Sequence, residues 1–401
     1  MSRAKQILQN SGLQDFLAGY PVNSYAPQPN GGAMTAPVVT YRLQHLRRTH
    51  SLTQEQLAHQ LGFKDRQTLS QIENGERKLS SAEMVRASEI FGVSLDYFTD
   101  PFELAGEGHF SWRENGTKPE ALDDFELRAG RWIAAYRHLS KVKGDVINSS
   151  TRRVALNHQS TFEEAIAEGE AMGKALELGS IPSKKLAEAL VDKLDTLVLE
   201  VDTAQGISGA ACRLNQLNAI VINRQETAAR RNYDMAHEFF HLITWDTMPP
   251  PRLDVATPTD KKTKRVEQLA DNFAAGLLMP TVLIEKLIDS SELAKGPELA
   301  TWLNSHAQML GVSAAALQWR LVNMGKINKA SMVNEESIKN NGDSQRAKPP
   351  AKFGRKFMEI IGWGLDEGHV SVRRISSLLN VTIDELSTIF ENHALPIPYD
   401  L

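Results

Sequence analysis

Cysteine is almost missing from this chain of 401 residues, since Cys212 is the only one. A single cysteine excludes an internal disulfide and any zinc site built from several cysteines. Long apolar runs are missing too, because no stretch approaches the roughly 18 uninterrupted apolar residues of a membrane helix. Residues 1–23 interrupt their apolar positions with Gln, Asn and Asp, so they lack the apolar core of a signal peptide. We therefore expect a cytoplasmic protein that makes no membrane contact.

The chain also lacks an excess of charge of either sign. Its formal net charge is only −4, from 45 Lys and Arg against 49 Asp and Glu. With this balance, binding to nucleic acid requires a local basic patch rather than a field over the whole surface. The composition is otherwise that of an ordinary globular protein, and the length suggests two to four domains.

Shifts in composition and in hydrophobic period divide the chain into parts. The pattern predicts a flexible arm (1–40), a small helical domain (41–102), a larger domain with a helical lead-in at 119–195 (119–330), a polar linker (331–351) and a C-terminal helical domain (352–401). Within the larger domain, short apolar segments punctuated by Gly and Asn predict three strands, at 196–201, 206–214 and 218–223. The fold class is therefore multidomain and mainly α, with a small sheet in a central α+β domain.

Residues 41–100 predict five short helices. Thr53 and Gln56 match a capping box for the second helix, and Asp65 can cap the third, which turns Leu69 and Ile72 inward. Polar side chains then face outward from the first two turns of the third helix. A helix-turn-helix protein reads DNA in this way, because the start of its second motif helix enters the major groove. The expected DNA contacts are Gln54, Arg66, Gln67, Thr68, Ser70, Gln71, Arg77 and Lys78.

Two alternatives remain open for these helices. The same pattern suits a bundle whose polar face is only solvated, and the same fold can serve protein contacts. However, "SLTQEQLAHQLGFKDRQTLSQIENGERKLSSAEMVRASEIFGVSLDYF" (51–98) resembles the Xre/Cro-type helix-turn-helix domain over almost its full length. The resemblance implies double-stranded operator DNA as a partner, and helix-turn-helix proteins commonly bind it as homodimers.

The segment "YDMAHEFFH" (233–241) carries a candidate metal site. His237 and His241 are four residues apart, so on a helix both imidazoles project from one face and can bind a single Zn²⁺. Glu238 lies beside them, where a carboxylate can accept a proton from water. We expect Asp234 to cap this helix. The alternative is a pair of ordinary histidines on an amphipathic helix.

A catalytic zinc usually takes three protein ligands. The helical segment "KRVEQLADNFAAGLLMP" (264–280) offers Glu267 and Asp271, one turn apart on the same side. We take Glu267 as the third ligand and Asp271 as the acceptor for the second N–H of a ligand histidine. Otherwise Glu267 is a solvated acidic residue that follows the basic run "KKTKR".

The sequences "NAIVINRQETAARRNYDMAHEFFHLI" and "VEQLADNFAAGLLMP" together resemble the ImmA/IrrE family of zinc-dependent peptidases, over roughly residues 170–325. The resemblance implies a gluzincin-like core, with His237, His241 and Glu267 as zinc ligands and Glu238 as general base. It also implies a protein substrate, namely a repressor or antitoxin encoded nearby, in stress, phage or toxin–antitoxin regulation. Strand 218–223 is a candidate to pair with an extended substrate.

Phe240 departs from this family, which usually has glycine before the second histidine. The departure keeps open a non-proteolytic transcription factor whose peptidase-like domain senses a metal or ligand.

The C-terminal part also mimics a helix-turn-helix. In "SVRRISSLLNVTIDELSTIF" (371–390), a helix turns at Asn380 into a second helix capped by Thr382 or Asp384. We interpret this unit as a structural lid or dimer contact rather than a second DNA reader.

Overall fold

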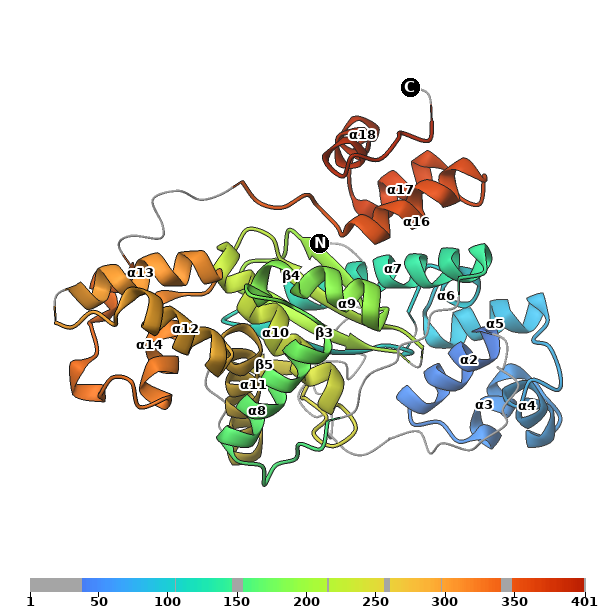
Figure 1. The fold of residues 1–401 in the computed structure, drawn as a ribbon. Helices are drawn as coiled ribbons and strands as arrows, with labels where there is room; N and C mark the ends of the chain where they lie inside the picture. The colour runs from blue at the N-terminus through green and yellow to red at the C-terminus, as the bar shows by residue number, and fades with distance from the viewer. Residues whose placement is uncertain are drawn as a thin grey trace, which may run out of the picture. The chain divides into compact units, whose positions relative to one another are not determined.

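The computed structural model describes residues 38–104, 106–145, 154–214, 216–255, 260–296, 298–339 and 348–399. The chain forms two compact units, one ending at Gly92 and the other beginning at Val93 (Figure 1). The multidomain, mainly helical fold expected from the sequence is confirmed. The arm expected at 1–40 lies almost wholly outside the described residues, and the finer boundaries within the second unit stay predictions.

The first unit is a bundle of four helices: α2 (Val38–Thr49), α3 (Gln54–Leu61), α4 (Arg66–Glu73) and α5 (Ser81–Phe91). Its centre is apolar, with Leu43, Leu57, Leu69 and Ile72 all fully buried. A fifth short helix, α6 (Asp96–Thr99), begins the second unit, so the predicted five helices are present.

Both predicted helix caps of the first unit are confirmed. The Gln56 amide donates to Thr53 Oγ1 at 3.2 Å, and the Thr53 amide donates back to Gln56 Oε1 at 2.8 Å. The Thr68 amide donates to Asp65 Oδ1 at 3.0 Å. Gly62 ends α3 in the left-handed region with φ of 79°, which a residue without Cβ adopts at little cost. These contacts fix where α4 begins.

The second unit is built on a five-stranded sheet in the order β2-β4-β3-β1-β5. Its strands are β1 (His109–Glu114), β2 (Leu197–Val201), β3 (Ile207–Arg213), β4 (Asn218–Asn223) and β5 (Leu253–Val255). β2 pairs with β4 and β1 with β5 in parallel, whereas β3 is antiparallel to both β4 and β1. The three predicted strands are confirmed, and β1 and β5 are additions that the sequence did not predict.

The prediction that strand 218–223 pairs with a substrate is wrong. This strand is β4, which is hydrogen-bonded to β2 on one side and to β3 on the other. Its nearly continuous apolar sequence reflects burial on both faces rather than a place at the edge.

Helices cover both faces of the sheet, because alternate residues of the inner strands turn to opposite sides. On one side lie α8 (Phe162–Ala175), α9 (Leu186–Leu194), α10 (Ala228–Thr244) and α11 (Lys261–Leu278), packed on residues such as Ala211 and Ile220. On the other lie α7 (Pro119–Lys143), α16 (Arg355–Asp366), α17 (Val372–Leu379) and α18 (Ile383–Asn392), packed on residues such as Ala210 and Val221. Figure 1 shows α7 and α16 on one side of the strands and α10 and α11 on the other.

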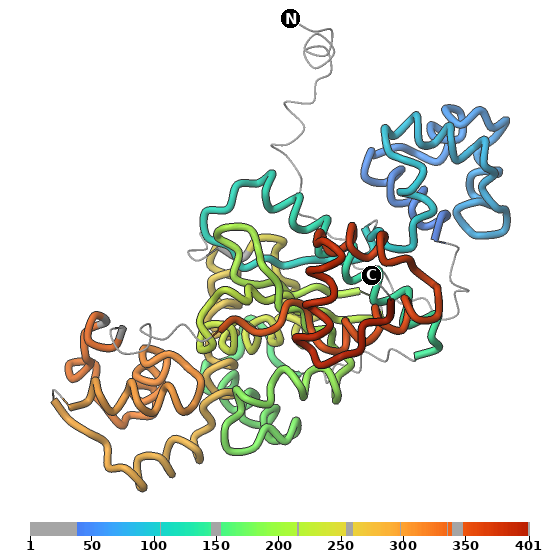
Figure 2. Tube along the Cα trace, turned by 90° about the horizontal axis from the view of Figure 1, so that it is seen from above, coloured from blue at the N-terminus to red at the C-terminus, as the bar shows by residue number. Residues whose placement is uncertain are grey.

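The remaining elements are α12 (Thr281–Ser291), α13 (Glu298–Leu310), α14 (Ala314–Asn323), α15 (Glu335–Lys339) and two short 3-10 turns, η1 (Pro182–Lys184) and η2 (Lys329–Ser331). Figure 2 shows the orange tube of α12–α14 at one end of the second unit and the red C-terminal helices toward the other. Among the described helices, none has the length and apolarity needed to cross a membrane.

The C-terminal helices share the core of the sheet. The ring of Phe353 stacks on Phe357 at 5.3 Å and meets Trp132 of α7 edge-on at 5.2 Å, while Trp132 Nε1 donates to the Leu378 carbonyl at 2.9 Å. The Phe353 amide also donates to the carbonyl of Glu200 at 2.7 Å, on the outer side of β2. Three helices form here, and Thr382 rather than Asp384 caps α18. They form a structural layer of the second unit.

Candidate metal centre and DNA-reading helix

The helix that carries both candidate histidines, α10, begins earlier than expected. Thr227 is its N-cap, and the Arg230 amide donates to Thr227 Oγ1 at 3.3 Å. The prediction that Asp234 caps this helix is therefore wrong. Asp234 lies in its second turn, fully buried, with Arg230 Nε donating to its carboxylate at 2.9 Å and Arg113 Nε 3.6 Å away. A buried carboxylate requires such cationic partners.

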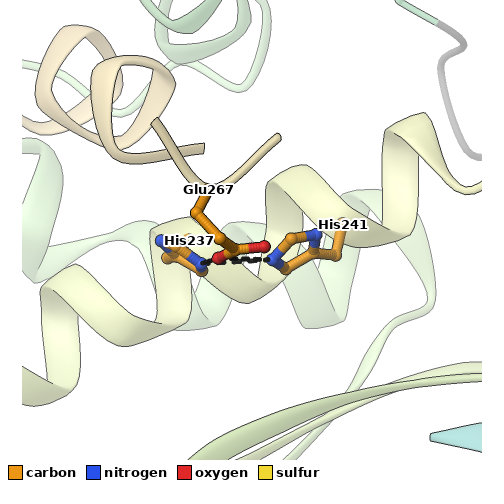
Figure 3. A group of neighbouring side chains, drawn as sticks. All are labelled: His237, His241 and Glu267. Atoms are coloured by element: carbon orange, nitrogen blue, oxygen red, sulfur yellow. Dashed lines mark hydrogen bonds and ion pairs between the residues drawn. The ribbon is translucent and has the colours of Figure 1, made fainter. Parts of the chain in front are cut away.

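His237 and His241 project from the same face of α10, and Glu267 reaches them from α11 (Figure 3). The two Nε2 atoms are 3.1 Å apart, and Glu267 Oε2 lies 3.0 Å from His237 Nε2 and 3.7 Å from His241 Nε2. A tetrahedral zinc with bonds of about 2.0–2.1 Å holds its ligand atoms about 3.3 Å from one another. The three predicted ligands are thus brought together at spacings that suit this ion.

The surroundings of the three side chains support a cation at this point. His237 and His241 are at most 1% exposed, and the side chain of Glu267 is 12% exposed. His241 Nδ1 and Glu267 Oε1 are buried without a hydrogen-bond partner among the described residues. Burial alone would raise the pKa of Glu267, but the charges of and hydrogen bonds from His241 and His237 outweigh it and hold that pKa far below its ordinary range. A carboxylate kept ionised beside two imidazoles fits the donor set of a zinc ion.

Asp271 lies where the sequence predicts it, one turn after Glu267. Its Oδ1 is 3.0 Å from His237 Nδ1. When this nitrogen carries the proton and donates it to Asp271, the lone pair of Nε2 faces Glu267 and His241. Burial raises the pKa of Asp271, but the hydrogen bond from His237 and the charges of His237 and Arg113 lower it below the usual range.

Glu238 lies on the side of α10 that faces the sheet and is 1% exposed. Gly209 of β3 lies next to it, because a Cβ at Gly209 would meet Glu238 Cγ at an ordinary 3.8 Å, and the close contact at this position is the Val221 carbonyl oxygen, 2.9 Å from that Cβ. Phe240 is fully buried, and its ring lies 5.6 Å from that of Phe273 on α11. The bulk of Phe240 therefore fills the core between α10 and α11.

Some residues that shape the site carry no obvious signal in the sequence. Gly169 of α8 lies directly against α11, because a Cβ there would stand only 2.3 Å from the Phe273 carbonyl oxygen. The half-buried Tyr233 donates its hydroxyl hydrogen to the backbone oxygen of Asp271 at 3.1 Å. Both contacts fix the course of α11 and with it the positions of Glu267 and Asp271. In the sequence, only the glycines of α8 and α11 hint at such close helix packing.

The DNA-reading candidates lie on the surface of the first unit. Arg66, Gln67 and Gln71 are exposed on α4, Thr68 and Ser70 are partly exposed, and Lys78 follows the helix on the surface. Within the described part of the chain, the side chains of Gln67, Ser70 and Gln71 make no hydrogen bond. These side chains thus extend into solvent from the helix that carries the predicted DNA contacts.

Side-chain contacts within the unit engage three of the candidates, namely Gln54, Arg66 and Arg77. Gln54 Nε2 donates to Glu73 Oε2 at 2.8 Å, and Arg66 Nε donates to Gln54 Oε1 at 3.2 Å. Arg47 Nε of α2 in turn donates a hydrogen bond to Oε1 of the buried Glu73 at 2.6 Å. Arg77 donates to both carboxylate oxygens of Glu83, at 2.7 and 3.2 Å. The contacts of Gln54 hold the start of α3 against α4, and the contact of Arg77 links the residues after α4 to α5.

Taken together, the two units define a DNA-binding protein of the helix-turn-helix class that carries a domain of metallopeptidase type. Comparison with family models shows the particular families. Residues 43–98 match a helix-turn-helix model, and residues 191–321 match the model of the M78 peptidases, described as the IrrE N-terminal-like domain. The chain is therefore a fusion of an Xre-type helix-turn-helix domain with a domain of the ImmA/IrrE family.

Comparisons with whole proteins add little. No curated protein matches the chain. Among solved structures, it is similar to Bacillus thuringiensis PlcR in complex with the peptide PapR7 and DNA, at 13% identity over 90% of this chain and 97% of that chain. The TM-score of this match is 0.16, which is too low to support any argument about fold or function.

Proposed function

We propose that the protein is a transcriptional regulator whose second unit is a zinc-dependent endopeptidase acting in the cytoplasm. Its substrate would be a repressor or antitoxin-like protein encoded nearby. One observation carries the proposal: the imidazoles of His237 and His241 and the carboxylate of Glu267 converge on one point, beside Glu238 of the same helix. This combination of residues is the one that metal-assisted peptide hydrolysis requires.

His237, His241 and Glu267 would hold the zinc ion, which when bound polarises a carbonyl group and acidifies water. Asp271 would accept a hydrogen bond from the Nδ1–H of His237 and so keep the lone pair of Nε2 directed at the site. Glu238 would accept a proton from the attacking water and return it to the departing amine nitrogen of the cleaved bond. Its burial shields this proton from bulk water.

The first unit would bring this chemistry to an operator as a homodimer. Gln67 and Gln71 on α4 are the residues proposed to read adenine through paired hydrogen bonds, and Arg66 the one to read guanine. Thr68, Ser70 and Lys78 would contact the bases or phosphates beside them, while Gln54 and Arg77 hold the helices in place. A helix-turn-helix partner bound to the same DNA would then lie within reach of the peptidase.

The test is to incubate the purified protein with Zn²⁺ and the product of the neighbouring gene. We expect the wild type to produce a discrete fragment and Glu238→Gln to produce none, while the variant still binds metal and DNA. If the wild-type protein leaves its partner intact, or if Glu238→Gln cuts equally well, the peptidase proposal is wrong.

A second function is favoured by the depth of the site. Glu238 and both histidines are at most 1% exposed, which leaves little of the catalytic group accessible to a polypeptide. The alternative is a transcription factor whose second unit senses a metal and cuts nothing. In that case a reporter gene should respond to Glu238→Gln as to the wild type, while His237→Ala should abolish the response to metal.

A further inference from the structure

Arg113 lies on β1, outside the segment that matches the peptidase family. In the antiparallel pair of β1 and β3 it stands directly opposite Gly209. Paired residues of neighbouring strands point to the same face, so the Arg113 side chain lies on the face that α10 covers.

The guanidinium group of Arg113 lies between two carboxylates from different helices. Its Nε is 3.6 Å from Asp234 Oδ1 on α10, and its Nη2 is 4.0 Å from Asp271 Oδ1 on α11. The same Asp271 oxygen lies 3.0 Å from His237 Nδ1. A continuous chain of contacts thus runs from β1 through Asp271 to a candidate ligand.

The two carboxylates that Arg113 contacts, Asp234 and Asp271, differ in their exposure to water. Asp234 is fully buried, so its charge depends on Arg113 and on Arg230, which donates to it at 2.9 Å. Asp271 is 46% exposed, so water competes for its carboxylate from the outer side. A cation held on the inner side by the sheet opposes the rotation of Asp271 into solvent.

We propose that Arg113 is a positioning residue of the metal centre. From β1, it holds the carboxylate that orients His237 and ties both ligand-bearing helices to the sheet. The inference rests on the metal site of the proposed function but not on proteolysis. It also makes residues 109–114 part of the functional metal domain, although they lie well before the family match.

The test measures the affinity of the full chain for Co²⁺ by competition with a chelator, together with the visible absorption of bound Co²⁺, which reports the geometry of the ligands. Loss of a residue that orients a ligand typically weakens metal binding by about 10–100-fold. We expect Arg113→Ala to fall in this range and to change the Co²⁺ spectrum, and Arg113→Lys to show a smaller loss.

Arg213→Ala is the matched control. Arg213 lies on the adjacent strand β3 and pairs with the exposed Asp246 at 2.8 Å rather than with Asp234 or Asp271. Its removal should leave affinity and spectrum unchanged. If Arg113→Ala remains folded and binds Co²⁺ like the wild type, the inference is wrong.

Should Arg113→Ala fail to fold, Arg113→Lys and Asp271→Asn decide the question. If Arg113 acts through Asp271, the double variant Arg113→Lys/Asp271→Asn should bind Co²⁺ no more weakly than Asp271→Asn alone. If instead the fold losses of Co²⁺ affinity in the two single variants multiply in the double variant, the inference is wrong. Wild-type protein that binds Co²⁺ but cleaves nothing would refute the proposed peptidase alone, whereas wild-type protein that binds no Co²⁺ would refute both.

Discussion

Gly276 of α11 lies so close to Ile166 of α8 that a Cβ at position 276 would stand 2.2 Å from the Ile166 carbonyl oxygen. The backbones of the two helices are therefore in direct contact. Since α11 also carries Glu267 and Asp271, α8 sets the distance between these carboxylates and the histidines of α10. The candidate metal site thus depends on a helix that precedes the family match.

We expect Gly276→Ala to destabilise the second unit by about 1–3 kcal/mol, because neither backbone can yield to the added methyl group without moving a helix. Thermal unfolding measures the effect. Gly130→Ala is the control, since a Cβ at this position of α7 would meet the side chain of Leu104 at an ordinary 3.6 Å. Because alanine is more favourable than glycine in a helix interior by up to about 1 kcal/mol, Gly130→Ala should not lower the melting temperature. Equal melting temperatures for Gly276→Ala and the wild type would contradict the close contact.

Glu267→Gln should weaken zinc binding by more than about 100-fold, beyond the loss typical of a residue that only orients a ligand. The amide keeps the shape of the side chain but loses the negative charge that the site holds ionised. Competition with a coloured chelator measures the affinity. Glu285→Gln is the control. Glu285 is an exposed residue of α12 that pairs with Lys326, and its variant should bind zinc like the wild type. Unchanged binding by Glu267→Gln would remove this residue from the ligand set.

Gln67→Ala and Gln71→Ala should each weaken DNA binding by roughly 5–150-fold, as expected for the loss of about 1–3 kcal/mol of base recognition. The measurement uses DNA selected from a random pool by the wild-type protein. The dependence on salt should not change, because neither residue carries charge. Gln60→Ala, an exposed glutamine on α3, should bind like the wild type. If all three variants behave alike, α4 does not read bases.

Acid should weaken the contacts at the end of β2 through Asp202. Burial raises the pKa of this carboxyl, but hydrogen bonds from Gln225 and Arg224 and the charges of Arg224 and Lys352 lower it below the ordinary value. The unfolded chain then binds the proton first, so this contribution to stability is present above roughly pH 4 and lost as the pH falls through the folded pKa. Asp202→Asn should therefore melt earlier at pH 7 and show a shallower loss of stability below pH 4. If the melting temperatures of Asp202→Asn and the wild type fall in parallel with pH over this range, the prediction is wrong.

The local features of the fold could be predicted because each depends on a few neighbouring residues. The capping box of Thr53 and the cap at Asp65 are short-range signals, and both formed as expected. The spacing of His237 and His241 likewise fixes their relative positions once α10 is helical. Glu267 required more, because the sequence shows its place on a helix but not the packing that turns it toward the histidines.

What could not be predicted depends on contacts between distant segments. Asp234 has the residue type of a cap, and only the fold shows that it is buried against Arg113 of a distant strand. β5 spans three residues, too few for a periodic pattern. The position of β4 inside the sheet follows from how strands pair, which their own sequences leave open.

The hydrogen bond from Phe353 to Glu200 has a consequence for how a peptide could approach the sheet. The chain near Phe353 already occupies the outer side of β2, so an incoming peptide cannot lengthen the sheet there. Among the described strands, β5 forms the other edge of the sheet, so a guest polypeptide in extended form would align along β5 or be held through its side chains alone.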